Sequence, residues 1–212
     1  TISKKLNKKT VFEISLGKED GGFDGYEEIK HIVSKMENFC RNMDFSLPYF
    51  LVVRTGNYVM ELGNVGSFES TFLDKNQATS KTNLLKIIEF CNKHGIRIKE
   101  HNTDYLSDRA LQLHPEIGIH AANIAPEFAV VETRAFLSLL KKHRLERELE
   151  KFIEISYSSK KWEKWMLSDS KLGKQEKAII SGHYIFGKNE FIDLKNDVER
   201  KVSLKGTLDS YL

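Results

Sequence analysis

Short apolar runs alternate along the chain with stretches in which apolar residues recur at helical spacing. Four runs have the length of buried strands, and the second is apolar on both faces, which is typical of a parallel sheet; they are 11–16, 49–53, 96–99 and 117–119. A period near 3.6 residues predicts helices between and after them; these cover about 24–43, 81–94, 108–113 and 126–143.

Local signals indicate where these helices begin and end. Asp24, with Glu27 three residues later, has the pattern of a capping box, and Ser107 is a suitable N-cap. Gly95 is a typical helix stop, and Pro126 fits a first helical turn. Residues 57–80 show no such pattern, so we predict a long loop there, of the kind that is often functional.

Strands that alternate with helices predict an α/β fold with a parallel sheet, either an open doubly wound sheet or part of an eight-stranded barrel. Four strands within the first 120 residues amount to half a barrel. We therefore expect the C-terminal half of a TIM-type (β/α)8 barrel, and completion of the sheet by a partner copy is the alternative. The expected organisation is a basic N-terminal segment (1–10), four βα units (11–144) and a helical C-terminal extension with a loose tail (145–212).

Composition narrows the classes of function. The 212 residues are 40% hydrophobic, which is enough for a core, and the net charge is only +3. The charges are spread along the chain, so neither nucleic acid nor an anionic membrane is expected as a partner. Without a long apolar segment or a secretory leader, we expect a soluble, cytoplasmic protein in which Cys40 and Cys91 are buried thiols.

The candidate chemistry lies where the last two strands end. Glu100, His101, Asn102 and Asp104 follow the third run, and His120 lies in the segment that leads to Asn123 after the fourth. In α/β folds, ligand-binding residues collect at the carboxyl ends of the strands. This stretch is the strongest functional signal in the sequence.

Glu13, His101 and His120 lie in three different strands, each at or near a strand end. A carboxylate and two imidazoles could together hold a divalent metal such as Zn, Mn or Ni, which would polarise a sugar carbonyl. Asp104 and Glu100 are then the candidate catalytic bases, or the partners that orient an imidazole. The alternative is that all of these are ordinary hydrogen-bonded loop residues.

Arg54 follows a wholly apolar strand, where a charge must be paired or must meet an anion. It is predicted either to bind a phosphate or carboxylate, or to form an ion pair with Glu61 or Glu100. The other candidate substrate-binding residues are Asn57, Asn102 and Asn123. The segment 63–67 could offer backbone N–H groups to a phosphate, although a plain turn fits it better.

The segments KEHNTDYLSDRAL and GIHAANIAPEFAVVETRAFLSLL resemble a known family. It comprises the accessory, non-catalytic subunits of tagatose-bisphosphate aldolase and the related tagaturonate epimerases. The accessory subunits carry a T-H-S-T-D-Y segment, which corresponds to Glu100–Tyr105 here, but their closing S-D-R-I-R-Y-Y-W signature is missing. The resemblance implies a TIM-type barrel, a sugar or sugar-phosphate ligand and, in the epimerase branch, Glu13, His101 and His120 as metal ligands. The accessory subunits have a lysine near the position of His120.

Two functions of different classes follow. The first is a metal-dependent epimerase, isomerase or aldolase that acts on a sugar acid or sugar phosphate. The second is a non-catalytic barrel subunit that stabilises a separate class II aldolase, with that aldolase or a second copy of the chain as its protein partner. A carbohydrate-binding regulator is a third, weaker reading.

Overall fold

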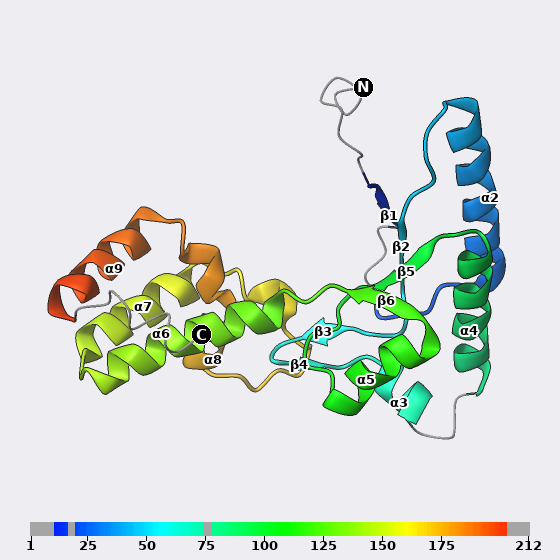
Figure 1. Cartoon of the computed structure of the whole chain (residues 1–212). Helices are drawn as coiled ribbons and strands as arrows, with labels where there is room; N and C mark the ends of the chain where they lie inside the picture. Colours follow the sequence, from blue (N-terminus) through cyan, green and yellow to red (C-terminus); the bar gives the residue numbers. More distant parts are fainter. Residues whose placement is uncertain (1–10, 17–19, 74–77, 203–212) are drawn as a thin grey trace. The chain divides into compact units, whose positions relative to one another are not determined.

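The computed structural model describes residues 11–16, 20–73 and 78–202 of the chain. They form two compact units, drawn in Figure 1. The first contains the chain up to Val59 together with Asn64–Asn123, and the second contains Met60–Gly63 and the chain from Ile124 onward. The expected basic segment 1–10 and most of the expected loose tail, 203–212, lie outside the described residues.

A parallel four-stranded sheet forms the centre of the first unit. Its order, β1-β2-β5-β6, follows the order of the chain. The strands are β1 (Glu13–Ser15), β2 (Phe50–Val53), β5 (Arg97–Glu100) and β6 (Ile119–Ala122). All four predicted strands are therefore present. The last one begins later than predicted because α5 continues to Ile117 and ends at Gly118, whose φ of 94° closes the helix in a left-handed conformation.

The predicted helices of this part of the chain are also present: α2 (Tyr26–Asn42), α4 (Ala78–Lys93), α5 (Asp108–Ile117) and α6 (Pro126–Lys142). Ser107 caps α5 as expected, since its side chain accepts a hydrogen bond from the Ala110 N–H at 3.2 Å. The capping box at Asp24 is wrong: Gly25 is the N-cap of α2 and makes no side-chain cap. The predicted loop 57–80 is also wrong in part, because it contains a short two-stranded sheet, β3 (Val59–Met60) and β4 (Gly63–Asn64), and the helix α3 (Phe68–Leu73).

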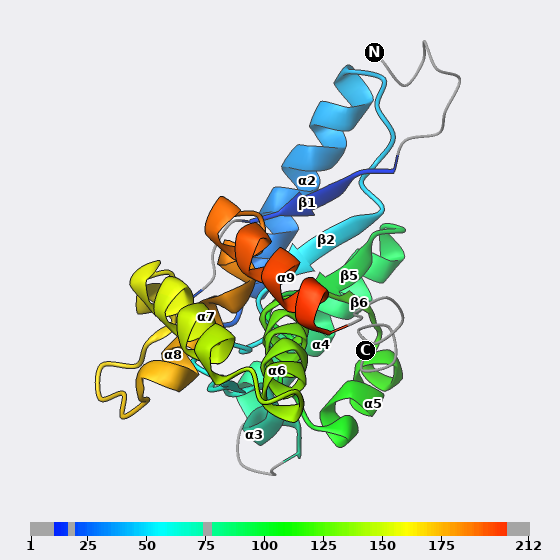
Figure 2. The ribbon, with the colours of Figure 1, turned by 90° about the vertical axis from the view of Figure 1, so that its left-hand side faces the viewer.

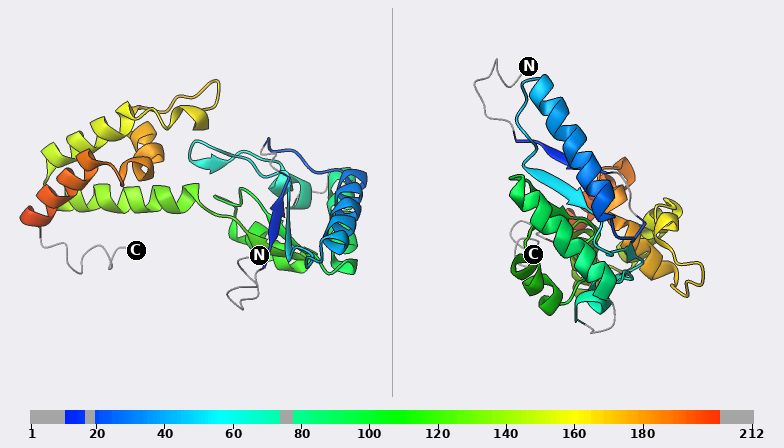
Figure 3. Two further views of the ribbon diagram at one scale, coloured as in Figure 1. Left: turned by 90° about the horizontal axis from the view of Figure 1, so that it is seen from above. Right: turned by 90° about the vertical axis from the view of Figure 1, so that its right-hand side faces the viewer.

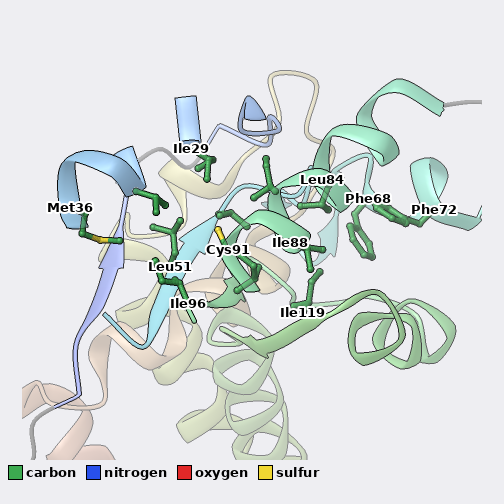
Figure 4. Close-up of a cluster of buried hydrophobic side chains, with 14 of the residues drawn as sticks. Ile29, Met36, Leu51, Phe68, Phe72, Leu84, Ile88, Cys91, Ile96 and Ile119 are labelled. Carbon is green, nitrogen blue, oxygen red and sulfur yellow. The ribbon is translucent and has the colours of Figure 1, made fainter. Parts of the chain in front are cut away.

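The helices of the first unit pack on one face of the sheet. Figure 3 shows α2 and α4 side by side along it, and Figure 4 shows the side chains between them and the strands. Because side chains alternate along a strand, Leu51 and Ile98 point into this core while their neighbours point to the other face. The same cluster takes side chains from α2, α3, α4 and α5; these include Ile29, Val33, Phe68, Leu84, Ile87 and Ala110.

The opposite face of the sheet carries charged and aromatic residues. Glu13, Phe50 and Arg97 lie in one row across β1, β2 and β5. Lys99 lies two residues after Arg97 on the same face of β5. Its side chain extends across β2, and its Nζ lies 2.7 Å from Glu13 Oε2. The strand order never reverses, and the described helices of this unit lie on one side of the sheet.

The second unit is helical. Its core joins α6 to the later helices through aromatic side chains, including Phe136, Phe152 and Phe191. Figure 2 shows α6, α7 and α9 within this unit. The unit contains α7 (Glu146–Ser158), η1 (Glu163–Trp165), α8 (Lys174–Ser181), η2 (Gly182–Ile185) and α9 (Asn189–Lys201). The apolar face of α6 packs in this core, and α6 belongs to the second unit.

None of the described helices is both long enough and apolar enough to cross a bilayer. The two cysteines are free and buried, as predicted.

Burial predicts slow thiol chemistry in the native protein. It raises the pKa of the Cys91 thiol to about 11. Since the thiolate is the reactive form, we expect Cys91 to react with an aromatic disulfide reagent at pH 8 at least roughly a hundredfold more slowly than in urea. Rapid mixing of the Cys40→Ser variant with the reagent isolates Cys91, and equal native and unfolded rates would contradict its burial.

Candidate functional site

The carboxyl edge of the sheet brings together seven of the nine predicted site residues. Parallel strands end at the same edge, so the segments after β2, β5 and β6 meet there. The Asn123 N–H donates to the Glu100 carbonyl at 3.0 Å, and the Thr103 hydroxyl donates to the Asn123 carbonyl at 2.7 Å. The seven residues in these segments are Arg54, Asn57, Glu100, His101, Asn102, Asp104 and Asn123.

Glu100 is the centre of a buried polar cluster. It shares the core face of the sheet with Ile98, and its side chain is fully buried. Its Oε1 accepts hydrogen bonds from the Thr55 hydroxyl and, at 2.6 Å, from the Asn57 amide. Its Oε2 lies 2.6 Å from Nε2 of His114 on α5. A buried carboxylate is costly unless it is hydrogen-bonded, and Thr55 and Asn57 supply two hydrogen bonds to one of its oxygens.

His114 and Thr55 are the members of this cluster that sequence reasoning missed. Only 5% of the His114 surface is exposed, and its ring lies 5.0 Å from that of Phe68. The available signal was its position four residues after Ala110, which places both on the buried face of α5. Asn57 Oδ1 is buried and has no hydrogen-bond partner among the described residues. The same holds for Glu100 Oε2 and His114 Nε2, which lie close together without the geometry of a hydrogen bond.

The loop that follows β5 is held in an unusual backbone conformation. Asn102 and Tyr105 have φ values of 59° and 60°, in the left-handed region that non-glycine residues seldom adopt. The Asn64 amide donates to the carbonyls of Asn102 and Asp104 at 2.9 and 3.0 Å. Such conformations persist only when their surroundings impose them, and they are frequent at functional sites.

The segment 63–67 acts as a turn that supports this loop. Asn64 Oδ1 accepts from the Gly66 N–H at 3.1 Å, the Val65 N–H donates to the Tyr58 carbonyl, and the Ser67 N–H donates to that of Gly56. These backbone donors are therefore used within the protein. For these three N–H groups the structure confirms a turn, and they are not available to bind a phosphate.

Arg54 forms an ion pair, but with partners other than those predicted. Its Nε donates to Asp24 Oδ1 at 2.7 Å, and its backbone N–H donates to Asp24 Oδ2 at 2.8 Å. The remaining guanidinium nitrogens donate to the Asp20 carboxylate and to the Phe23 carbonyl. The hydrogen bond to Asp24 raises the pKa of Arg54. Pairing with Glu61 or Glu100 is therefore wrong, since two carboxylates from the loop after β1 neutralise this arginine.

This network predicts a pH effect at Asp20. The hydrogen bond from Arg54 holds the pKa of the Asp20 carboxyl below its usual value. A carboxyl whose pKa is lower in the folded than in the unfolded state stabilises the fold above the unfolded pKa, near 4, and loses that contribution as the pH falls through the folded value. In an NMR titration, we expect the Asp20 midpoint to rise in the Arg54→Lys variant, which keeps the charge but loses the planar fork. An unchanged midpoint would show that Arg54 does not hold this carboxylate.

The three predicted metal ligands do not form one site. Glu13 begins β1 instead of ending it, and its carboxylate pairs with Lys99 on the face opposite to Glu100. His120 lies in the irregular step of β6, where its Nδ1 accepts from the Ile98 N–H at 3.3 Å, and burial and then the nearby Arg97 lower its pKa. His101 alone follows a strand at the carboxyl edge. Within 11–16, 20–73 and 78–202, no three His, Cys, Asp or Glu side chains are arranged to hold a metal ion.

The first unit is thus an α/β fold with a parallel sheet and a buried polar cluster at the carboxyl edge of that sheet. No protein-family model matches the sequence, and a search of curated proteins gives no match. Among solved structures, the chain is similar to a probable tagatose 6 phosphate kinase from Sinorhizobium meliloti 1021, with a TM-score of 0.70 and 14% identity over 94% of this chain and 52% of that one. It is also similar to the fructuronate-tagaturonate epimerase of Cohnella laeviribosi, with a TM-score of 0.51 and 11% identity over 98% of this chain and 44% of that one.

The chain thus spans about half the length of the solved structures that it matches. At these identities the likeness is one of fold. It confirms the remote resemblance that the H-N-T-D-Y segment indicated, and both matched proteins are named for sugar-derived compounds.

Proposed function

We propose that the first unit is half of an eight-stranded (β/α)8 barrel, and that it takes part in epimerisation, isomerisation or aldol chemistry on a sugar acid or sugar phosphate. The winding of the sheet and the position of its helices support the architecture. The matched structures, about twice as long as this chain, have room for a second set of βα units.

The observation that carries the proposed chemistry is the buried cluster around Glu100. All three reaction types move a proton next to a carbonyl group, which requires acid–base groups held in a fixed geometry. In our proposal Asp104 transfers the proton at the loop after β5. Glu100 is a positioning residue, because its Oε1 is already engaged by Thr55 and Asn57 and its Oε2 lies against the His114 ring, away from the loop.

The proton transfer proposed for Asp104 does not require a divalent metal ion, and binding of such an ion is a separate proposal. The residues suggested as its ligands do not fit one ion, because Glu13 and His120 are engaged elsewhere on the sheet. Elemental analysis after incubation with Zn, Mn or Ni tests metal binding directly, and the His101→Ala variant tests whether the carboxyl edge contributes a ligand.

The reaction itself is tested by incubating the purified protein with fructuronate, tagaturonate and the ketohexose phosphates in D₂O. Proton NMR should show deuterium incorporated next to the carbonyl group. Epimerisation and isomerisation exchange the hydrogen that is abstracted there, and aldol cleavage leaves an enolate that takes its proton from solvent. The Asp104→Asn variant should lose exchange by roughly a hundredfold or more while remaining folded. Exchange that is equal in wild type and variant, or absent with every substrate, would contradict the proposal.

The second candidate function is a non-catalytic subunit of a class II sugar-bisphosphate aldolase. The dispersal of the predicted metal ligands favours it. In that case the protein should lengthen the half-life of such an aldolase on heating without itself supporting exchange. A half-life unchanged by equimolar protein would remove this alternative.

A further inference from the structure

A hollow rich in lysine lies on the second unit, between the end of α7 and η1. The side chains that line it are Lys160, Lys161, Glu163 and Lys164, and its volume is about 450 Å³. Pockets that hold small molecules measure roughly 300–1,000 Å³, so this hollow is large enough for one. We call it the lysine hollow. Three ammonium groups and one carboxylate give its lining a net charge of +2.

The positive charge of the lysine hollow is not neutralised within the second unit. None of its three lysines forms an ion pair with any residue that the structure describes. Lys174 and Lys201 of the same unit differ in this respect, because their Nζ atoms lie 2.5 and 2.6 Å from carboxylate oxygens of Glu154 and Glu148. Neighbouring like charges repel each other, so a bound anion would relieve this repulsion as well as form new contacts.

Two aromatic rings hold Lys164 in place. Its Nζ lies 4.7 Å from the centre of the Trp165 ring and 5.2 Å from that of the Tyr184 ring. The Trp165 indole N–H donates to the Tyr184 hydroxyl at 3.2 Å, which joins the two rings. An aromatic face attracts an ammonium group without neutralising it. Lys164 is therefore positioned for an anion, and less side-chain freedom is lost when it binds one.

The backbone around the lysine hollow is fixed by hydrogen bonds. The Lys160 N–H donates to the Tyr157 carbonyl at 3.1 Å, and the Lys160 carbonyl accepts from the Glu163 N–H, also at 3.1 Å. The Trp165 carbonyl accepts from the Glu61 N–H at 2.7 Å. The Cα positions of the lining lysines are thus set by the fold before any ligand binds.

We propose that the lysine hollow binds a small anion that carries two or more phosphate groups. An ammonium group has three donors that can rotate toward an anion, and hydrogen bonds between charged groups are stronger than neutral ones. Because the lysines without ion pairs line one hollow of this volume, we favour a small molecule over a long polyanion. The candidate site lies in the first unit, so this proposal does not rest on the proposed function.

Isothermal titration calorimetry of the full chain with inorganic pyrophosphate tests the proposal. We expect binding that weakens as salt is added, and the Lys164→Gln variant should weaken it at least about tenfold. Lys195→Gln is the matched control, since Lys195 lies on α9 in the same unit and pairs with Glu199 at 3.8 Å. It removes the same charge outside the hollow, so the affinity should stay within about twofold of wild type. Absence of pyrophosphate binding, or equal weakening by both variants, would overturn the proposal.

Two further variants locate the bound anion. Glu163→Gln removes the negative charge from the lining and should tighten pyrophosphate binding by about twofold or more. Asp104→Asn, in the candidate site, should leave pyrophosphate binding unchanged. Loss of binding in Asp104→Asn would place the anion at the candidate site, and binding of heparin without binding of pyrophosphate would indicate an extended basic surface. Either result would overturn the proposal.

Discussion

Replacing Glu100 with alanine is expected to lower the free energy of unfolding of the first unit by about 3–5 kcal/mol, because each buried polar group that loses its hydrogen-bond partner costs about 1–3 kcal/mol. The change leaves the Thr55 hydroxyl and the Asn57 amide without their common acceptor in the interior. It also leaves a small cavity beside Phe68. Urea unfolding followed by circular dichroism measures the loss.

Glu116→Ala is the matched control for this prediction. Glu116 also forms an ion pair, with Arg109 at 3.3 Å, but both side chains are more than half exposed. Exposed pairs contribute at most about 1 kcal/mol, so this variant should unfold almost as the wild type does. If Glu100→Ala lowered the free energy of unfolding no more than Glu116→Ala does, the buried cluster would not stabilise the fold. The proposed role of Glu100 as a positioning residue would then be contradicted as well.

Gly66→Ala has the second large expected effect. A Cβ at Gly66 would lie 2.1 Å from the Gly56 carbonyl oxygen, 2.6 Å from the Tyr58 nitrogen and 2.7 Å from the Asn57 Cα. These are backbone atoms, which cannot move aside as a flexible side chain can. We expect a loss of about 3 kcal/mol in the free energy of unfolding, at the upper end of ordinary single substitutions.

Gly63→Ala provides the comparison, because nothing lies within 4 Å of a Cβ built at Gly63. It should change the free energy of unfolding by no more than about 1 kcal/mol. The Gly66 variant should also impair ligand binding, since it displaces Asn57 and, through Asn64, the loop after β5. A stable Gly66→Ala protein with intact binding would mean that the two backbone segments do not approach each other this closely.

The elements of the fold were predictable because they depend on local pattern. The runs at 49–53 and 96–99 are long enough in apolar residues to be recognised as strands, and Ser107 is recognisable as a cap from its neighbours alone. The short pieces between 57 and 80 escaped prediction because two-residue strands carry no measurable periodicity. Helix α6 belongs to the second unit because Phe136 packs against Phe152 and Phe191 on later helices. A contact between residues so far apart in the sequence cannot be predicted from a local pattern.

The site was predictable only in part, for a similar reason. Chain order places Asn57, Glu100 and Asn123 after three parallel strands, so their common edge could be foreseen. Without the register of the strands, sequence spacing does not show which face of the sheet a residue occupies. For this reason the sequence did not show that Glu13 points to the opposite face, where it pairs with Lys99. The pairing of His114 with Glu100 depends on how α5 is rotated about its axis.

The order of the sheet has a consequence for how the protein forms during translation. Each strand of the main sheet pairs with the main-sheet strand made before it, so the sheet can grow by one edge as the ribosome releases the chain, at about 5–20 residues per second. Glu100 leaves the ribosome before His114, and for that interval its carboxylate remains hydrated. The arrival of α5 therefore completes the burial of this charge and commits the nascent unit to its final packing.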